Sequence, residues 1–130
     1  MGDDGSVPDQ PDTRRPRGVY GRGTDPDPRF SMANERTYLA WMRTGLALVA
    51  GAVAVQSPYL DLGGAVEVAL SLALLALAAG CVAHAWTRWR RMEIAMRTGG
   101  PLPGFTSATA FAVAVGALVL VVLVATVLTR

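Results

Sequence analysis

Three long apolar runs, kept largely apart from charged residues, limit what this sequence can fold into. They cover residues 39–56, 65–86 and 105–128. A soluble helix or strand would mix polar and apolar residues at its own period, whereas a run of about 20 apolar residues matches the core of a bilayer. Hydrophobic residues make up 52% of the 130-residue chain and charged residues 17%. The sequence therefore predicts an all-α membrane protein.

The breaks between the runs predict three transmembrane helices in an up-down-up bundle. The first helix is expected to begin near Ser31 to Asn34, where small polar side chains can cap it, at about residue 34. It is expected to end at Ser57-Pro58, because proline cannot continue a helix. The next loop is so short that the first two helices must be antiparallel neighbours. Glycine and proline residues in 99–104 end the second helix. We expect helices at about 34–57, 65–97 and 105–128, within a membrane domain of residues 29–130.

Residues 1–28 are expected to form a disordered cytoplasmic tail. Five of the eight prolines lie there, and apolar residues are sparse. Such a segment buries too little apolar surface to offset the entropy lost on ordering. No cleavable signal peptide is expected, since the first apolar run begins only after this Asp-bearing tail.

Arginine placement predicts the orientation of the helices. Basic residues flank the start of the first run and the end of the second, while the loop between these runs holds Asp61. The positive-inside rule then places the N-terminus in the cytoplasm and the C-terminus outside. At the end of the second run we expect an interfacial belt, in which tryptophans lie at headgroup level. It comprises Trp86, Arg88, Trp89, Arg90 and Arg91.

Arg36 and Arg43 are the candidate functional residues. They are seven residues apart and so share one helix face, about two turns apart. Arg43 lies inside the first apolar run, where an arginine costs about 2.5–3.5 kcal/mol on insertion scales. We interpret the pair as an anion-binding site that faces protein or an interior cavity, with Asn34, Glu35 and Thr44 as supporting residues. The same face carries small residues that allow close approach of another helix, namely Ala40, Ala47, Ala50, Gly51 and Ala54.

A structural role for the two arginines is the alternative. Arg43 is expected one to two turns inside the cytoplasmic edge, and a long side chain can reach about 6 Å back to the headgroups. Pairing with Glu35 would also offset part of the charge. Both interpretations stay open at this point.

Catalytic and metal-binding patterns are missing from the sequence. There is no nucleophile–base–acid set, no phosphate-binding glycine loop and no pair of carboxylates within the spans, which argues against an enzyme. His84 is the only histidine and Cys81 the only cysteine, so neither a metal site nor a disulfide framework is expected. We expect no cofactor, and the net charge of +2 gives no reason to expect nucleic acid.

The stretch from Arg29 to Thr44, RFSMANERTYLAWMRT, closely resembles the signature of the YidH-like family of small bacterial inner-membrane proteins. The segment RWRRMEIAMR, from Arg88 to Arg97, with the Leu-Pro turn after it, is a second match. The resemblance covers about residues 28–130 and implies a multi-pass protein of the bacterial plasma membrane. A similar domain of unknown function forms the membrane part of the eukaryotic vacuolar transporter chaperone, which makes and translocates polyphosphate. The resemblance implies that Arg36 and Arg43 match basic residues that line the polyanion path there, although no soluble catalytic domain is expected from this sequence.

The sequence thus leads to two functional hypotheses. In the first, a non-enzymatic membrane protein associates with copies of itself, and Arg36 and Arg43 bind or pass a phosphate-rich anion. In the second, the chain is an assembly or stabilising subunit of another membrane protein complex and has no ligand of its own. The lipid bilayer is a partner in both.

Overall fold

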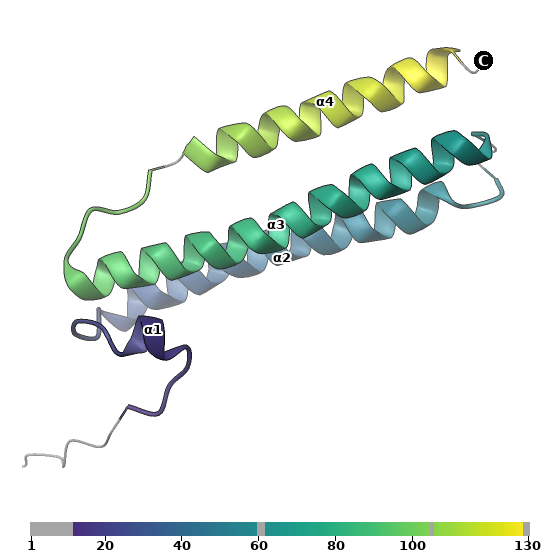
Figure 1. Ribbon diagram of the computed structural model, residues 1–130. Helices are drawn as coiled ribbons and strands as arrows, with labels where there is room; N and C mark the ends of the chain where they lie inside the picture. The colour runs from purple at the N-terminus through teal and green to yellow at the C-terminus, as the bar shows by residue number, and fades with distance from the viewer. Residues whose placement is uncertain (1–11, 60–61, 105, 129–130) are drawn as a thin grey trace, which may run out of the picture.

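The computed structural model describes residues 12–59, 62–104 and 106–128. Helices form nearly all of this part of the chain, and no strand occurs in it. Figure 1 shows the two longest helices side by side as an antiparallel hairpin, with the last helix set apart from them and antiparallel to α3. The helices are α1 (Arg17–Tyr20), α2 (Pro28–Val55), α3 (Gly64–Thr98) and α4 (Thr106–Leu128).

Helix α2 begins at Pro28, earlier than the start predicted near residue 34. The Asp27 side chain accepts a hydrogen bond from the backbone N–H of Arg29 at 2.9 Å, and proline suits the first helical position because its missing donor would have no partner there. Ser31 and Asn34, taken from the sequence as capping residues, lie inside the helix instead. The other end of α2 is at Val55, just before Ser57-Pro58, as proline geometry predicts.

Helix α3 lies between two glycines with positive φ. Gly63 has a φ of 82° before the first turn, and Gly99 has a φ of 66° at the C-cap. The left-handed conformation of Gly99 lets Gly100 donate its N–H to the Ala95 carbonyl, which closes the helix end. The helix therefore continues well past the second apolar run, as its sequence predicts.

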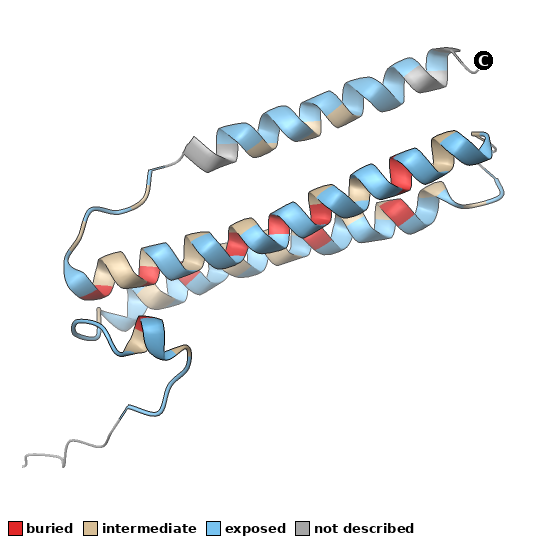
Figure 2. Ribbon diagram, viewed as in Figure 1, coloured by how far each residue is buried: buried red, intermediate tan, exposed pale blue. Residues whose placement is uncertain are grey.

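Small residues allow α2 and α3 to pack closely against each other. Gly45 and Ala52 of α2 are buried against α3, where Ala78 and Cys81 are also buried. A Cβ atom at Gly45 would lie 3.6 Å from the Ala78 carbonyl oxygen and from the Cys81 Cβ. The buried residues follow the line along which the two helices meet (Figure 2). Close packing of this kind stabilises helix pairs in lipid, where no hydrophobic effect draws helices together.

Helix α4 makes far less contact with the hairpin. Its Phe111 ring lies edge-on to the Trp41 ring of α2, with centroids 4.8 Å apart. Large apolar side chains along α4, such as Val113, Leu120 and Leu123, are exposed. A helix of this kind suits a lipid environment, since lipid tails are as apolar as its side chains.

Two helices, α2 and α3, are long and apolar enough to cross a membrane. In α4 the apolar stretch found among the described side chains, Thr109–Val124, is shorter. The all-helical architecture is consistent with a helical membrane protein, as predicted.

The part of the predicted disordered tail that the structure describes is ordered against α3. We call residues 12–27 the N-terminal strap. Its Val19 is fully buried, and its Thr24 donates its backbone N–H to the Arg97 carbonyl at 3.2 Å. Gly23 has a φ of 59°, and a Cβ atom there would collide with the Arg97 carbonyl oxygen, so this approach needs glycine. In the described part of the tail, one buried valine and several polar contacts hold the strap against α3. Residues 1–11 lie outside the described residues.

Candidate functional site

Arg36 and Arg43 project away from α3. The side of α2 that faces α3 is marked by its buried residues Asn34, Gly45 and Ala52. Arg36 follows Asn34 by two residues and Arg43 precedes Gly45 by two, which at about 100° per residue turns both arginines to the opposite side of the helix. Both side chains are exposed, and neither forms an ion pair or hydrogen bond with another described residue.

The small residues near these arginines are also uncovered. Ala40, Ala47, Ala50 and Ala54 are exposed, while Gly51 is half-buried. We call this face, with Arg36 and Arg43, the outward face of α2. The expectation that it faces protein is not met within the described chain, because α3 packs on the other side. No other helix of the described residues packs on the outward face.

The three predicted supporting residues do not gather around the arginines. Asn34 is buried and donates from Nδ2 to the Trp89 carbonyl at 3.1 Å. Thr44 donates its hydroxyl to the Ala40 carbonyl one turn earlier, at 3.1 Å, which is a bond internal to the helix. Glu35 is exposed beside Trp89 and forms no ion pair among the described residues. The structure therefore brings none of the three into one site with Arg36 and Arg43.

A cluster of aromatic side chains, here called the aromatic belt, is a reference for the position of each arginine along α2. Trp86 and Trp89 stack with ring centroids 5.3 Å apart, and the Tyr38 ring lies 6.5 Å from that of Trp89. Arg36 is at the level of this belt. Arg43 follows Tyr38 by five residues, so it lies about 7–8 Å deeper along α2. The predicted interfacial arginines are at the belt end of α3: Arg88 is half-buried, and Arg90 and Arg91 are exposed.

Sequence reasoning missed a buried polar group at the same end of the hairpin. We call Ser31, Asn34, Glu93 and Arg97 the Glu93 cluster. Glu93 is 2% exposed and Arg97 5%. The Glu93 carboxylate accepts from the Ser31 hydroxyl at 3.0 Å and from Asn34 Nδ2 at 3.3 Å, while Arg97 Nε lies 3.5 Å from Glu93 Oε1. The Glu93 charge is thus paired and hydrogen-bonded, as a buried carboxylate requires, whereas Arg97 Nε is in ion-pair range but has no hydrogen-bond partner among the described residues.

The N-terminal strap completes this arrangement. Asp25 lies 2.7 Å from the Arg97 guanidinium, and the Tyr20 ring stacks on that guanidinium at 4.7 Å. A hydrogen bond from Arg14 lowers the pKa of Asp12 to about 2. Hydrogen bonds from Arg14, then from Arg97, also lower the pKa of Asp25. The strap is thus fixed to the end of α3 by charged contacts.

One sequence signal for the cluster was visible. Glu93 and Arg97 are four residues apart, a spacing that predicts an ion pair on a helix surface. Their burial depends on Ser31 and Asn34, which lie about sixty residues earlier and were assigned to a helix cap. The cluster has no nucleophile or metal-ligand set, and no group of three metal-ligating side chains occurs in the described parts of the chain. Its visible role is to join α2, α3 and the strap.

The sequence is similar to a known protein family and to known bacterial proteins. A protein-family model, described as "Domain of unknown function (DUF202)", matches residues 29–95, which span α2 and most of α3. An uncharacterized protein of Mycobacterium tuberculosis (strain H37Rv) is 43% identical over 105 residues, covering 75% of this chain and 85% of that protein. Inner membrane protein YidH of Escherichia coli (strain K12) is 44% identical over 82 residues, covering 62% of this chain and 71% of YidH. No solved structure matches the chain significantly. The chain therefore belongs to the YidH-like DUF202 family of membrane proteins.

Proposed function

We propose that this protein is a non-enzymatic, three-span protein of the bacterial plasma membrane whose copies associate through the outward face of α2. In this arrangement α2, α3 and α4 cross the bilayer in alternating directions, with the N-terminus in the cytoplasm. The alternating helix directions in Figure 1 support this topology, as does the absence of charged residues from 105–128. The arginines at the belt end of α3 support the orientation.

Arg43 is the observation that carries the proposal of association. It is exposed, lies inside an apolar span and forms no ion pair within the described residues. Facing acyl chains there would cost about 2.5–3.5 kcal/mol on insertion scales. The exposed alanines beside it allow a second copy to approach closely, which removes the guanidinium from lipid.

A phosphate-rich anion is the ligand that suits this arrangement. Copies that share an axis would place several guanidinium groups of Arg36 and Arg43 around one space. Guanidinium pairs well with phosphate oxygens because it offers two parallel donors to two oxygens. The anion would in turn neutralise charges that otherwise repel each other.

The second candidate function is an assembly or stabilising subunit without a ligand. The depth of Arg43 favours it, because 7–8 Å below the aromatic belt is close to the reach of a long side chain toward the headgroups. In that case the outward face would contact another membrane protein. Loss of Arg43 would then lower the yield of that partner and leave anion binding unchanged.

The test uses the full chain in nanodiscs of phosphatidylcholine, with native mass spectrometry for copy number and labelled polyphosphate as the anion probe. We expect the wild-type protein to form an oligomer that binds polyphosphate, and Arg43→Ala to weaken binding at least about tenfold through loss of charge-assisted hydrogen bonds. Arg90→Ala is the matched control, because it removes an exposed arginine at the end of α3. Arg43→Lys keeps the charge and should keep the oligomer while binding less tightly. A monomeric wild-type protein, or equal binding by Arg43→Ala and wild type, would rule the proposal out.

A further inference from the structure

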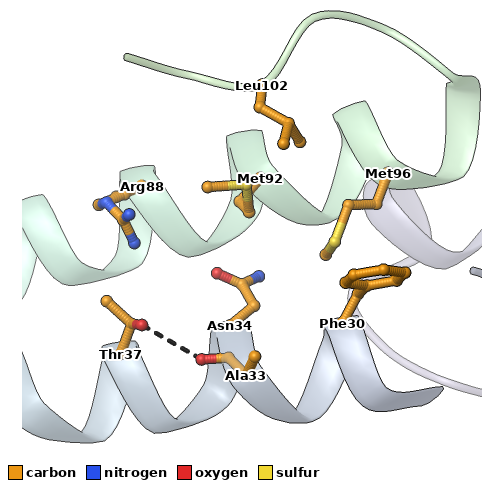
Figure 3. Close-up of a pocket in the computed structure, with 8 residues that line it drawn as sticks. All are labelled: Phe30, Ala33, Asn34, Thr37, Arg88, Met92, Met96 and Leu102. Atoms are coloured by element: carbon orange, nitrogen blue, oxygen red, sulfur yellow. Dashed lines mark hydrogen bonds between the residues drawn. The ribbon is translucent and has the colours of Figure 1, made fainter. Parts of the chain in front are cut away.

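A pocket of about 190 Å³ lies between the start of α2 and the end of α3. Figure 3 shows Arg88 and Thr37 at one end of it and Asn34 at its centre. The apolar part of its lining consists of Phe30, Met92, Met96 and Leu102. Methionine side chains adapt their shape readily, so this lining can adjust to the carbon skeleton of a small flexible group.

Asn34 brings an unpartnered hydrogen-bond acceptor to this pocket. Its Nδ2 donates to the Trp89 carbonyl and to the Glu93 carboxylate. Both of those partners are acceptors, so the amide cannot be turned round without losing the two bonds. Its Oδ1 is left buried and without a hydrogen-bond partner among the described residues. Buried acceptors normally have a hydrogen-bond donor, so a ligand hydroxyl in this pocket would supply the missing partner.

Arg88 supplies a cation at the end of the same pocket. It is half-buried, and no ion pair or hydrogen bond joins it to the rest of the described chain. The pocket thus combines a positive charge, an acceptor that needs a donor, and an apolar wall. A single water would satisfy Asn34 but fill only about 30 Å³, and it would leave Arg88 unused.

We infer that this pocket binds the headgroup of an anionic phospholipid whose phosphate ester carries hydroxyl groups, as phosphatidylglycerol does. The phosphate would pair with Arg88 and a headgroup hydroxyl would donate to Asn34 Oδ1. The acyl chains would leave the pocket at its Arg88 end, toward the apolar part of the hairpin. The volume is below the range of about 300–1,000 Å³ typical of sites that enclose a whole ligand, so it suits a headgroup whose tails stay outside. The pocket also lies beside Trp89, at the level of the aromatic belt, where headgroups are found.

Native mass spectrometry of the full chain, released from detergent with defined lipids, tests this inference. The probes are phosphatidylglycerol, phosphatidylethanol, which has the same charge without the headgroup hydroxyls, and neutral phosphatidylcholine. We expect retention to fall in that order. Arg88→Gln should weaken phosphatidylglycerol binding about tenfold or more, through loss of a charge-assisted hydrogen bond. Arg90→Gln, the same change at an exposed position, should leave binding within about twofold.

A second variant fills the pocket without altering charge. Ala33 is exposed and lines the pocket, so Ala33→Leu should fold normally and exclude the headgroup, whereas Ala79→Leu on an exposed part of α3 should not. Equal losses in Arg88→Gln and Arg90→Gln would show nonspecific attraction and overturn the inference, as would unchanged binding in Ala33→Leu. Equal retention of phosphatidylethanol and phosphatidylglycerol would overturn the role of Asn34. Glycerol 3-phosphate that binds as tightly as the lipid would overturn the lipid assignment. None of these outcomes bears on polyphosphate binding at Arg43, so this inference and the proposed function fail independently.

Discussion

Removal of the Glu93 carboxylate is expected to destabilise the hairpin more than any change at an exposed charge. In Glu93→Ala the Ser31 hydroxyl and Asn34 Nδ2 lose an acceptor, and Arg97 loses a neighbouring carboxylate while its own side chain is 3% exposed. Removing one member of a buried ion pair costs about 3–5 kcal/mol. Because Arg97 keeps its contact with Asp25, we expect a loss near the lower end, about 3 kcal/mol.

The free energy of unfolding can be measured in mixed micelles by titration with SDS, with tryptophan fluorescence as the signal because Trp89 packs beside the cluster. Glu35→Ala is the matched control, since it removes an exposed carboxylate from α2 and should change stability by no more than about 0.5 kcal/mol. The double variant Glu93→Ala/Arg97→Ala should lose less than the sum of its single variants, because no buried charge is left without its partner. Additive losses, or a Glu93→Ala protein as stable as Glu35→Ala, would refute the reasoning.

Three further changes test other parts of the fold. Gly23→Ala places a Cβ atom on a left-handed residue, where it collides with the Arg97 carbonyl oxygen and should loosen the strap. In limited proteolysis, trypsin should therefore cut the strap faster while the hairpin stays intact. An unchanged cutting rate would contradict the described contact of the strap with α3. Gly45→Leu overfills the contact between α2 and α3 and should cost about 1–3 kcal/mol in the same SDS titration, whereas Leu46→Ala, at an exposed position, should cost much less. Hydrogen bonds from Arg14 lower the pKa of Asp12 from 3.8 to about 2 and also lower the pKa of Asp25. The ionised carboxylates therefore stabilise the strap above about pH 4, and this stabilisation is lost as the pH falls toward 2. Hydrogen-exchange protection of residues 16–24 should therefore be steady from pH 5 to 8 and drop near pH 2.5, and equal protection at both ends would argue against these ion pairs.

The helices themselves follow from the sequence, because apolar runs and proline or glycine breaks act locally. Ser57-Pro58 ends α2 close to where it was predicted to end, and α3 continues past its apolar run to Thr98. The start of α2 was predicted too late because Ser31 and Asn34 belong to the residue types that cap helices. The same hydroxyl and amide groups here bind a carboxylate that lies far along the chain.

The side of α2 that packs against α3 could not be deduced from the sequence of α2 alone. In a soluble protein the apolar side of a helix identifies the core, but in a span both sides are apolar and small residues occur on each. Gly45 and Ala52 contact α3, whereas Ala40 and Ala47, an equally plausible set by spacing, are exposed. The choice depends on complementary shape in α3, including the buried Cys81, and spacing within α2 does not contain that information.

The length of α3 has a consequence for what meets the aqueous phase. Its 35 residues extend about 52 Å at 1.5 Å per residue, whereas the hydrocarbon core of a bilayer is about 30 Å thick. With only residues 56–63 between α2 and α3 at the opposite end, most of the excess length lies at the end that carries Thr98. In the proposed three-span arrangement, close to 20 Å of rigid helix would therefore extend beyond the hydrocarbon at that end, which is more than helix tilt alone would accommodate. A small chemical label on a cysteine placed at Thr98 would be reachable from one side of a sealed vesicle, and so report directly which way this protein is inserted.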